Sequence, residues 1–163
     1  MATNVGNEDP AQNPRRSLGK QISYLARSFR RIVEHELAPL GVGSGTHFFL
    51  RVIHLHPGIT QNELSERTQI DKATAAKGLA RLEDLGYLLR VPDGRDRRIR
   101  RLYLTNAGKR IIPSIHATLR HVTEICATNL DEGELDRLFT LLDRVEDAVS
   151  AHIAGVKQER VGS

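Results

Sequence analysis

One stretch of the chain, residues 60–105, constrains the fold more than any other. It contains two short helical patterns separated by a polar step at Thr68 and Gln69, followed by two strand-like runs joined by an arginine-rich turn. Two helices with a tight turn and then a hairpin are typical of a winged helix-turn-helix. We therefore expect a mainly α-helical fold with a small β-hairpin wing.

The two short helices have recognisable ends. Thr60 is followed three residues later by Glu63, so hydroxyl and carboxylate can satisfy each other's free amides in a capping box. Asp71 can cap the second helix, because its carboxylate then lies at the positive end of the helix dipole. Gly86 is placed to end that helix in the left-handed conformation.

The second helix has an apolar and a polar side. Spacings of three and four residues put one set on the core side, namely Ala75, Leu79, Leu82 and Leu85. The other side is polar or small, which suits an approach to base edges in a DNA major groove. The residues of the two helices predicted to contact DNA are Thr60, Gln61, Lys72, Thr74, Ala75, Lys77 and Arg81.

The hairpin is predicted from strands at residues 87–91 and 99–104, with the turn signal Asp93-Gly94 between them. From Asp93 to Arg101 the chain has five arginines and two aspartates, a local charge of +3. An isolated basic hairpin usually just faces water, but beside a helix-turn-helix it can reach phosphates or the narrower groove. The wing residues predicted to contact DNA are Arg95, Asp96, Arg97, Arg98 and Arg100.

The wing also resembles a known family. The run Asp96-Arg97-Arg98, followed by Leu104-Thr105 and then Gly108, resembles the wing signature of the MarR (multiple antibiotic resistance regulator) family of bacterial transcription factors. Residues 82–88 are similar to that family too, and the resemblance extends over most of the chain. It implies that Arg98 enters the minor groove and that Asp96 holds it in position.

The whole chain has 163 residues, a length that suits one domain. We expect a mobile tail at residues 1–17, a single MarR-like domain at 18–155, and a C-terminal tail at 156–163. Within the domain, the winged helix-turn-helix should cover about residues 44–105, between N- and C-terminal dimerisation helices at about 18–38 and 106–155.

Local signals place the ends of these flanking helices. Pro39 and Gly41 should end the first, and Ser44 or Thr46 should cap a further segment at residues 48–55. That segment is apolar nearly all round, which predicts burial. Asp131 should cap the last helix.

The last helix carries a heptad-like apolar seam, which favours pairing with a second copy of the chain. Packing of the same side chains on the chain's own core is the alternative. The predicted dimer-interface residues are Ile22, Leu135, Leu138, Leu142, Val145 and Val149.

Composition limits the other functions. The net charge is +4, and with no tryptophan and only seven other aromatics the chain is poorly equipped to stack single-stranded bases, so duplex DNA is the expected partner. The single cysteine, Cys126, lies in an apolar stripe, which favours core packing over a redox role. Seven histidines form no recognisable ligand set and no catalytic constellation appears, so we expect no enzyme activity, metal or cofactor.

No apolar run approaches the ~20 residues that span a bilayer, and we expect a cytoplasmic protein acting on a bacterial or archaeal nucleoid.

These features predict a homodimeric repressor that binds an inverted-repeat operator. A low-specificity architectural DNA-binding protein is the alternative, because excess positive charge alone would support it. The resemblance also implies a small, often aromatic and anionic, effector bound between the DNA-binding lobe and the dimer helices. Its predicted contacts are Tyr24, Arg27, Arg31, His47, Phe48, Ile115 and His116.

Overall fold

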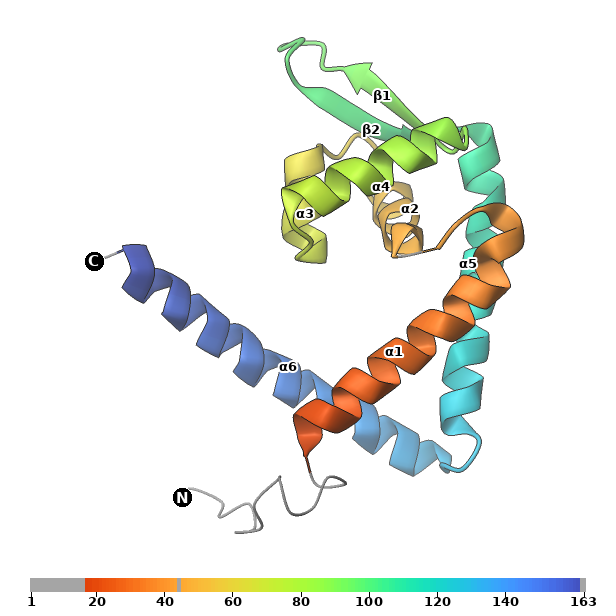
Figure 1. Cartoon of the computed structure of the whole chain (residues 1–163), viewed down its shortest axis with the longest axis vertical. Coiled ribbons are helices and arrows are strands. Elements are labelled where there is room, and N and C mark those ends of the chain that lie inside the picture. Colours follow the sequence, from red (N-terminus) through yellow and green to blue (C-terminus); the bar gives the residue numbers. More distant parts are fainter. Residues whose placement is uncertain (1–16, 44, 162–163) are drawn as a thin grey trace. The chain divides into compact units, whose positions relative to one another are not determined.

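A computed structural model describes residues 17–43 and 45–161 of the chain. The fold is mainly helical with one two-stranded hairpin, as predicted (Figure 1). In chain order the elements are α1 (Leu18–Leu37), η1 (Ala38–Leu40), α2 (Thr46–Leu55), α3 (Gln61–Thr68), α4 (Lys72–Asp84), β1 (Leu88–Pro92), β2 (Arg100–Leu104), α5 (Asn106–Ala127) and α6 (Glu132–Val161). They divide into two compact units, one up to Val122 and one from Thr123 onward.

The first helix begins one residue after its cap. The Ser17 hydroxyl accepts from the Lys20 amide at 3.4 Å, so Ser17 starts α1 and does not belong to a tail; the remainder of the predicted tail, residues 1–16, lies outside the described residues. The helix ends at Leu37, and a 3-10 turn then closes at Gly41, whose φ of 67° is left-handed. The predicted stop at Pro39 and Gly41 is therefore confirmed.

Helix α2 is less buried than its sequence predicted. Phe49, Leu50 and Ile53 form one buried stripe, but Phe48 remains 47 % exposed and Leu55 68 % exposed. The helix packs one side against the core, and the opposite side, which carries Phe48 and Leu55, meets solvent. The predicted cap is also wrong for Thr46, which is the first helical residue and donates its hydroxyl to the Gly43 carbonyl at 2.6 Å; Ser44 is outside the described residues.

One core joins the elements of the first unit, from the C-terminal half of α1 to the first half of α5. Leu50, Leu64, Leu79, Leu102 and Ile115 are all 0 % exposed. Burying each such side chain stabilises the fold by roughly 1.5–3 kcal/mol. These contacts come from α2, α3, α4, β2 and α5, so the helix-turn-helix and the hairpin share a single core.

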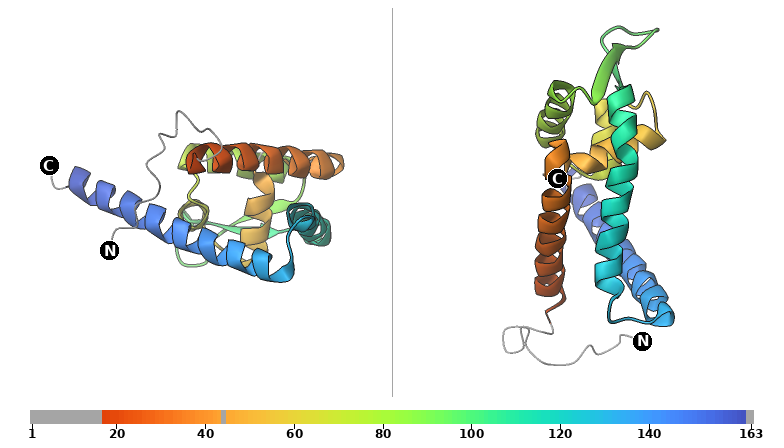
Figure 2. Two further views of the ribbon diagram at one scale, coloured as in Figure 1. Left: turned by 90° about the horizontal axis from the view of Figure 1, so that it is seen from below. Right: turned by 90° about the vertical axis from the view of Figure 1, so that its right-hand side faces the viewer.

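The hairpin is antiparallel, with Leu88 opposite Leu104 and Pro92 opposite Arg100. Both strands begin one residue later than predicted. On its other side β2 meets the segment before α3, where the Leu102 amide donates to the Ile59 carbonyl at 2.9 Å. The hairpin is thereby attached to the lobe through β2 and projects beyond α3 and α4 (Figures 1 and 2).

Two glycines mark places where elements come too close for a side chain. A Cβ at Gly108 would lie 2.2 Å from the Tyr87 carbonyl oxygen, and one at Gly78 would lie 2.4 Å from the Phe49 ring. The first brings α5 against the start of the hairpin and the second brings α4 against α2. Gly108 is thus required by close packing at the junction between wing and α5.

In the second unit, Asp131 caps α6 as predicted. Its carboxylate accepts from the Glu134 amide at 2.8 Å, and Glu134 accepts from the Asp131 amide at 3.1 Å. The helix continues to Val161, so the C-terminal tail predicted at 156–163 is wrong over most of its length. Its large apolar side chains that remain exposed are Leu138, Phe139, Leu141, Leu142, Val149 and Ile153.

Candidate nucleic-acid interface

The helix-turn-helix is built from the predicted local signals. The Thr60 amide donates to Glu63 Oε2 at 2.8 Å, and the Glu63 amide donates to the Thr60 hydroxyl at 3.3 Å. Hydrogen bonds from the Thr60 backbone and then its side chain lower the pKa of Glu63. Between the helices Gln69 takes the left-handed conformation with φ 53°. Asp71 then accepts from the Thr74 amide at 2.9 Å and starts α4.

Helix α4 has the two sides that its periodicity predicted. Ala75, Leu79 and Leu82 are 0 % exposed. Ala75 was also predicted to contact DNA, and that is wrong because its side chain lies wholly within the core. Leu85 is 38 % exposed, because α4 ends at Asp84, just before it.

The opposite side of α4 is solvent-exposed and basic. Lys72, Thr74, Lys77 and Arg81 are all exposed, as predicted for a surface that meets a groove. Arg81 is held by a bond from its Nη2 to the Gly41 carbonyl at 3.1 Å. Lys77 therefore has more freedom to adapt to a base edge than Arg81.

The wing is organised by Asp93, whose sequence signal was only that of a turn residue. Its carboxylate accepts from the amides of Arg95 at 2.8 Å and Asp96 at 3.1 Å, and it pairs with the Arg101 side chain. The Arg101 hydrogen bond is the largest cause that lowers the pKa of Asp93 to about 2. Arg101 also donates to the Gly58 carbonyl at 2.9 Å, which ties the hairpin to the lobe.

The other four wing arginines, Arg95, Arg97, Arg98 and Arg100, are exposed. The resemblance implied that Asp96 holds the Arg98 side chain in position. In the structure, Asp96 Oδ1 instead accepts from the Arg98 backbone amide at 2.9 Å. Asp96 thus shapes the backbone of the tip. The contact leaves the Arg98 guanidinium available for an outside partner.

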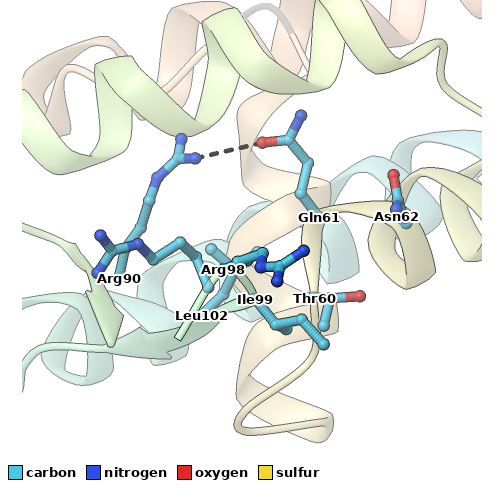
Figure 3. Close-up of a pocket in the computed structure, with 8 residues that line it drawn as sticks. Thr60, Gln61, Asn62, Arg90, Arg98, Ile99 and Leu102 are labelled. Atoms are coloured by element: carbon cyan, nitrogen blue, oxygen red, sulfur yellow. Dashed lines mark hydrogen bonds between the residues drawn. The ribbon is translucent and has the colours of Figure 1, made fainter. Parts of the chain in front are cut away.

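A hollow of about 350 Å³ lies between the N-terminus of α3 and the wing (Figure 3). It brings together four predicted DNA contacts, Thr60 and Gln61 at the start of α3 and Arg98 and Arg100 of the wing, with residues that were not predicted. Its lining residues are Thr60, Gln61, Asn62, Arg90, Arg98, Ile99, Arg100 and Leu102. The backbone amides at a helix start and two exposed arginines suit a phosphate group.

Arg90 links three elements beside this hollow. Its Nε donates to Glu83 Oε2 at 2.7 Å. Its Nη1 donates to Gln61 Oε1 at 3.2 Å, the bond that Figure 3 marks with a dashed line. Sequence reasoning missed Arg90 and Glu83, although one signal was present. Arg90 shares a strand face with Leu88, which is 2 % exposed, and a charged group on the core side of a strand needs a partner.

The effector contacts were predicted for another place, between the DNA-binding lobe and the dimer helices, and none of them lines this hollow. Tyr24, Arg27, Arg31 and His116 are exposed, whereas Ile115 is fully buried. The partly exposed Phe48 ring lies 4.1 Å from the His47 ring, between centroids.

His47 itself is 5 % exposed. Burial first, and then the neighbouring Arg51 charge, lower the pKa of His47 to about 4. The described part of the chain offers no hydrogen-bond partner to His47 Nδ1 or Arg51 Nε. His47 is therefore a neutral imidazole at pH 7.

The predicted dimer residues are distributed over both units. Ile22 on α1 is 42 % exposed, and on α6 Leu138, Leu142 and Val149 are 38 %, 45 % and 53 % exposed. Leu135 and Val145 are partly buried, as is Cys126, the free cysteine.

No group of three or more potential metal ligands occurs in residues 17–43 and 45–161. Over the same described ranges, no helix is long and apolar enough to cross a membrane.

Comparisons with known proteins agree with this geometry. The MarR family model matches residues 40–99. The chain is 29% identical over 139 residues to the uncharacterized HTH-type transcriptional regulator YybA of Bacillus subtilis (strain 168). The aligned part covers 85% of this chain and 93% of that protein. A crystal structure of a MarR transcriptional regulator from Methanosarcina mazei Go1 is 32% identical, with a TM-score of 0.76 over 82% of this chain and 98% of that one. A MarR family regulator from Listeria monocytogenes complexed with 26mer DNA shares the fold, with 23% identity and a TM-score of 0.78 over 86% of this chain and 94% of that one.

Proposed function

This chain belongs to the MarR family of DNA-binding transcriptional regulators, and from that premise we propose that it is a homodimeric repressor of an inverted-repeat operator. Regulators of this family are not enzymes. The proposed site of action is the nucleoid, in the cytoplasm of a bacterium or archaeon.

The presence of two basic surfaces on one compact unit supports this proposal. Helix α4 presents Thr74, Lys77 and Arg81 on its exposed side, and the hairpin presents its four exposed arginines beyond it. Helix α4 suits the major groove, where side chains distinguish base pairs, and the wing suits the flanking backbone and minor groove. Thr60, Gln61 and Lys72 lie at helix starts, where phosphates are the expected contacts.

The exposed apolar side chains of α6 support the homodimer. A helix surface carrying Leu138, Leu142 and Val149 in solvent is unusual for a monomer. A second copy of the same helix offers a matching surface under two-fold symmetry. Ile22, Leu135 and Val145 complete the proposed interface. Two symmetric copies of α4 then read half-sites about one helical turn, ~34 Å, apart.

We also propose release by a small aromatic acid. Arg27, Arg31 and His116 are exposed and available as polar contacts, together with the Tyr24 hydroxyl. Phe48 and Ile115 supply apolar surface, and the neutral His47 is a hydrogen-bonding group in place of a charge. A ligand shifts DNA release only by its differential affinity for the two states, and ~1–3 kcal/mol of coupling is typical.

Selection of binding sites from genomic DNA, followed by footprinting at several salt concentrations, tests the proposal. We expect a protected inverted repeat, with the operator bound about 10³-fold or more tightly than random duplex. An architectural protein, which the net charge of +4 would also suit, would instead protect all duplexes alike with a similar salt slope. Titration of salicylate-like acids against the operator complex, repeated with Arg31→Ala and His116→Ala, tests the effector.

A further inference from the structure

Three side chains from three elements meet beneath the wing. Arg90 of β1 donates from Nε to Glu83 of α4 at 2.7 Å and from Nη1 to Gln61 of α3 at 3.2 Å. Gln61 Nε2 in turn donates to the Lys72 carbonyl at 3.5 Å. We call Gln61, Glu83 and Arg90 the Arg90 brace. Because Lys72 begins α4 and Glu83 lies in its last turn, the brace touches that helix near both ends.

The brace is partly shielded from water. The Arg90 and Glu83 side chains are 27% and 34% exposed, and Arg90 stands opposite Leu102, which is 0 % exposed. A charge-assisted bond in such a position is stronger and more directional than an ion pair on an open surface. The guanidinium is planar and uses two of its donors on two different helices.

A second tie acts on the other strand. Arg101 of β2 pairs with Asp93 at the turn and donates to the Gly58 carbonyl before α3. This tie fixes the hairpin to the segment that precedes the helix-turn-helix. The Arg90 brace instead connects the hairpin to α4 itself, the helix proposed to enter the major groove.

The geometry points to Arg90 as a positioning residue for DNA recognition. We propose that the Arg90 brace sets the orientation of the wing relative to α4, so that both reach neighbouring grooves of one duplex at the same time. The inference rests on the proposed function. In the proposed arrangement, the Gln61 and Glu83 side chains hold Arg90 in place and do not contact a base.

The proposal predicts an effect of unexpected sign. Glu83 is an acidic residue close to the proposed DNA-binding surface. If charge alone held the DNA, removing this negative charge would leave the affinity for DNA unchanged or raise it. If Glu83 orients Arg90, its removal instead weakens operator binding. We expect Glu83→Ala to lose about ten-fold in operator affinity, comparable to one mismatched base pair, with little change on random duplex.

Asp84, the residue after Glu83, provides a matched control. Asp84 is an exposed acid at the end of α4 and takes part in none of the three brace contacts. Asp84→Ala removes the same charge and should bind the operator as tightly as the native protein or more tightly. Arg90→Lys keeps the positive charge but cannot reach Glu83 and Gln61 together, so it should resemble Glu83→Ala. The double change Arg90→Glu with Glu83→Arg restores an ion pair and should regain part of the affinity.

Affinity is measured with the full-length protein on the selected operator and on random duplex, alongside thermal unfolding and hydroxyl-radical footprints. We expect Glu83→Ala to keep native thermal stability within a few degrees, to keep major-groove protection, and to lose the protection that the wing gives. If Glu83→Ala unfolds, Glu83→Gln replaces it; this variant retains an acceptor oxygen and should fall between native and Arg90→Lys.

Two results would overturn the brace. One is equal operator affinity for Glu83→Ala and Asp84→Ala. The other is a uniform loss for Arg90→Ala on all duplexes, with a salt slope reduced by about one, which would make Arg90 a phosphate contact. The proposed function fails in a different way: the native protein would then show no preferred sequence at all. If the native protein selects an operator but Glu83→Ala binds that operator equally well, the proposed function stands and only the brace is contradicted.

Discussion

The helix-turn-helix lobe and α6 place their leucines in opposite environments. In the lobe, Leu50, Leu64 and Leu79 are 0 % exposed, whereas on α6 Leu138 and Leu142 keep 38 % and 45 % of their surface exposed. Both regions have apolar residues at helical spacing. The lobe completes its core within one chain, while α6 leaves apolar side chains exposed, which is the surface that the proposed second copy would cover. Periodicity alone therefore shows that a helix has an apolar side, but not which molecule covers it.

The largest expected effect tests the α6 half of this comparison. Leu138→Glu together with Leu142→Glu places two charges on the exposed seam and should abolish both dimerisation and operator binding, because one half-site alone binds weakly. Sedimentation and operator titration measure the two effects. Thr140→Glu, at an exposed position on the same helix, should remain dimeric. A well-folded native monomer at micromolar concentration would contradict the dimer.

The second prediction tests how tightly the lobe is packed. Gly108→Ala places a Cβ against the Tyr87 carbonyl oxygen and should lower the free energy of unfolding by roughly 1–3 kcal/mol. Chemical denaturation measures the change. Gly155→Ala on α6 meets nothing within 4 Å and should leave stability unchanged or slightly raised. Equal stability of the two variants would show that the wing and α5 pack less closely than described.

The third prediction concerns the buried imidazole of the lobe. The pKa of His47 falls from 6.5 to about 4 on folding, so between these values the unfolded chain binds a proton that the folded chain does not. Stability should therefore decrease as pH falls through this window, by roughly 3 kcal/mol from this residue.

His47→Gln should flatten the fall in stability between pH 6.5 and 4. His116→Gln, at an exposed position, is the matched control and should retain the native profile. Thermal unfolding at a series of pH values measures both. A native profile in His47→Gln would assign the acid sensitivity to other groups.

The last predictions concern DNA affinity and leave the folding of the lobe unchanged; they compare α4 with the wing. Lys77→Ala should weaken operator binding by roughly 1–3 kcal/mol and relax preference at one position if Lys77 contacts a base, without changing stability. Arg98→Ala should weaken binding more than Arg95→Ala, since Arg98 lines the hollow and Arg95 does not. Operator titration with single-base variants measures these changes, and an equal loss on every duplex would assign Lys77 to phosphate.

Sequence reasoning was most successful where the signal is local. The Thr60–Glu63 capping box, the Asp71 cap and the glycine turn at Gly86, with φ 72°, were all predicted and are all present. Each depends on atoms within a few residues of one another. The α6 boundary was missed because a polar, charged C-terminal sequence can continue a helix without an apolar signal.

The sequence by itself determined the order of elements, the polar and apolar sides of α4, and the excess charge of the wing. Only the tertiary structure decided which charges are available. It brings Arg90 to Gln61, 29 positions away, and Arg101 to Gly58, 43 positions away. It also buries His47 deeply enough to keep the imidazole neutral down to about pH 4. Propensity, capping and periodicity act over one or two helical turns, whereas desolvation and side-chain pairing depend on neighbours that only packing supplies.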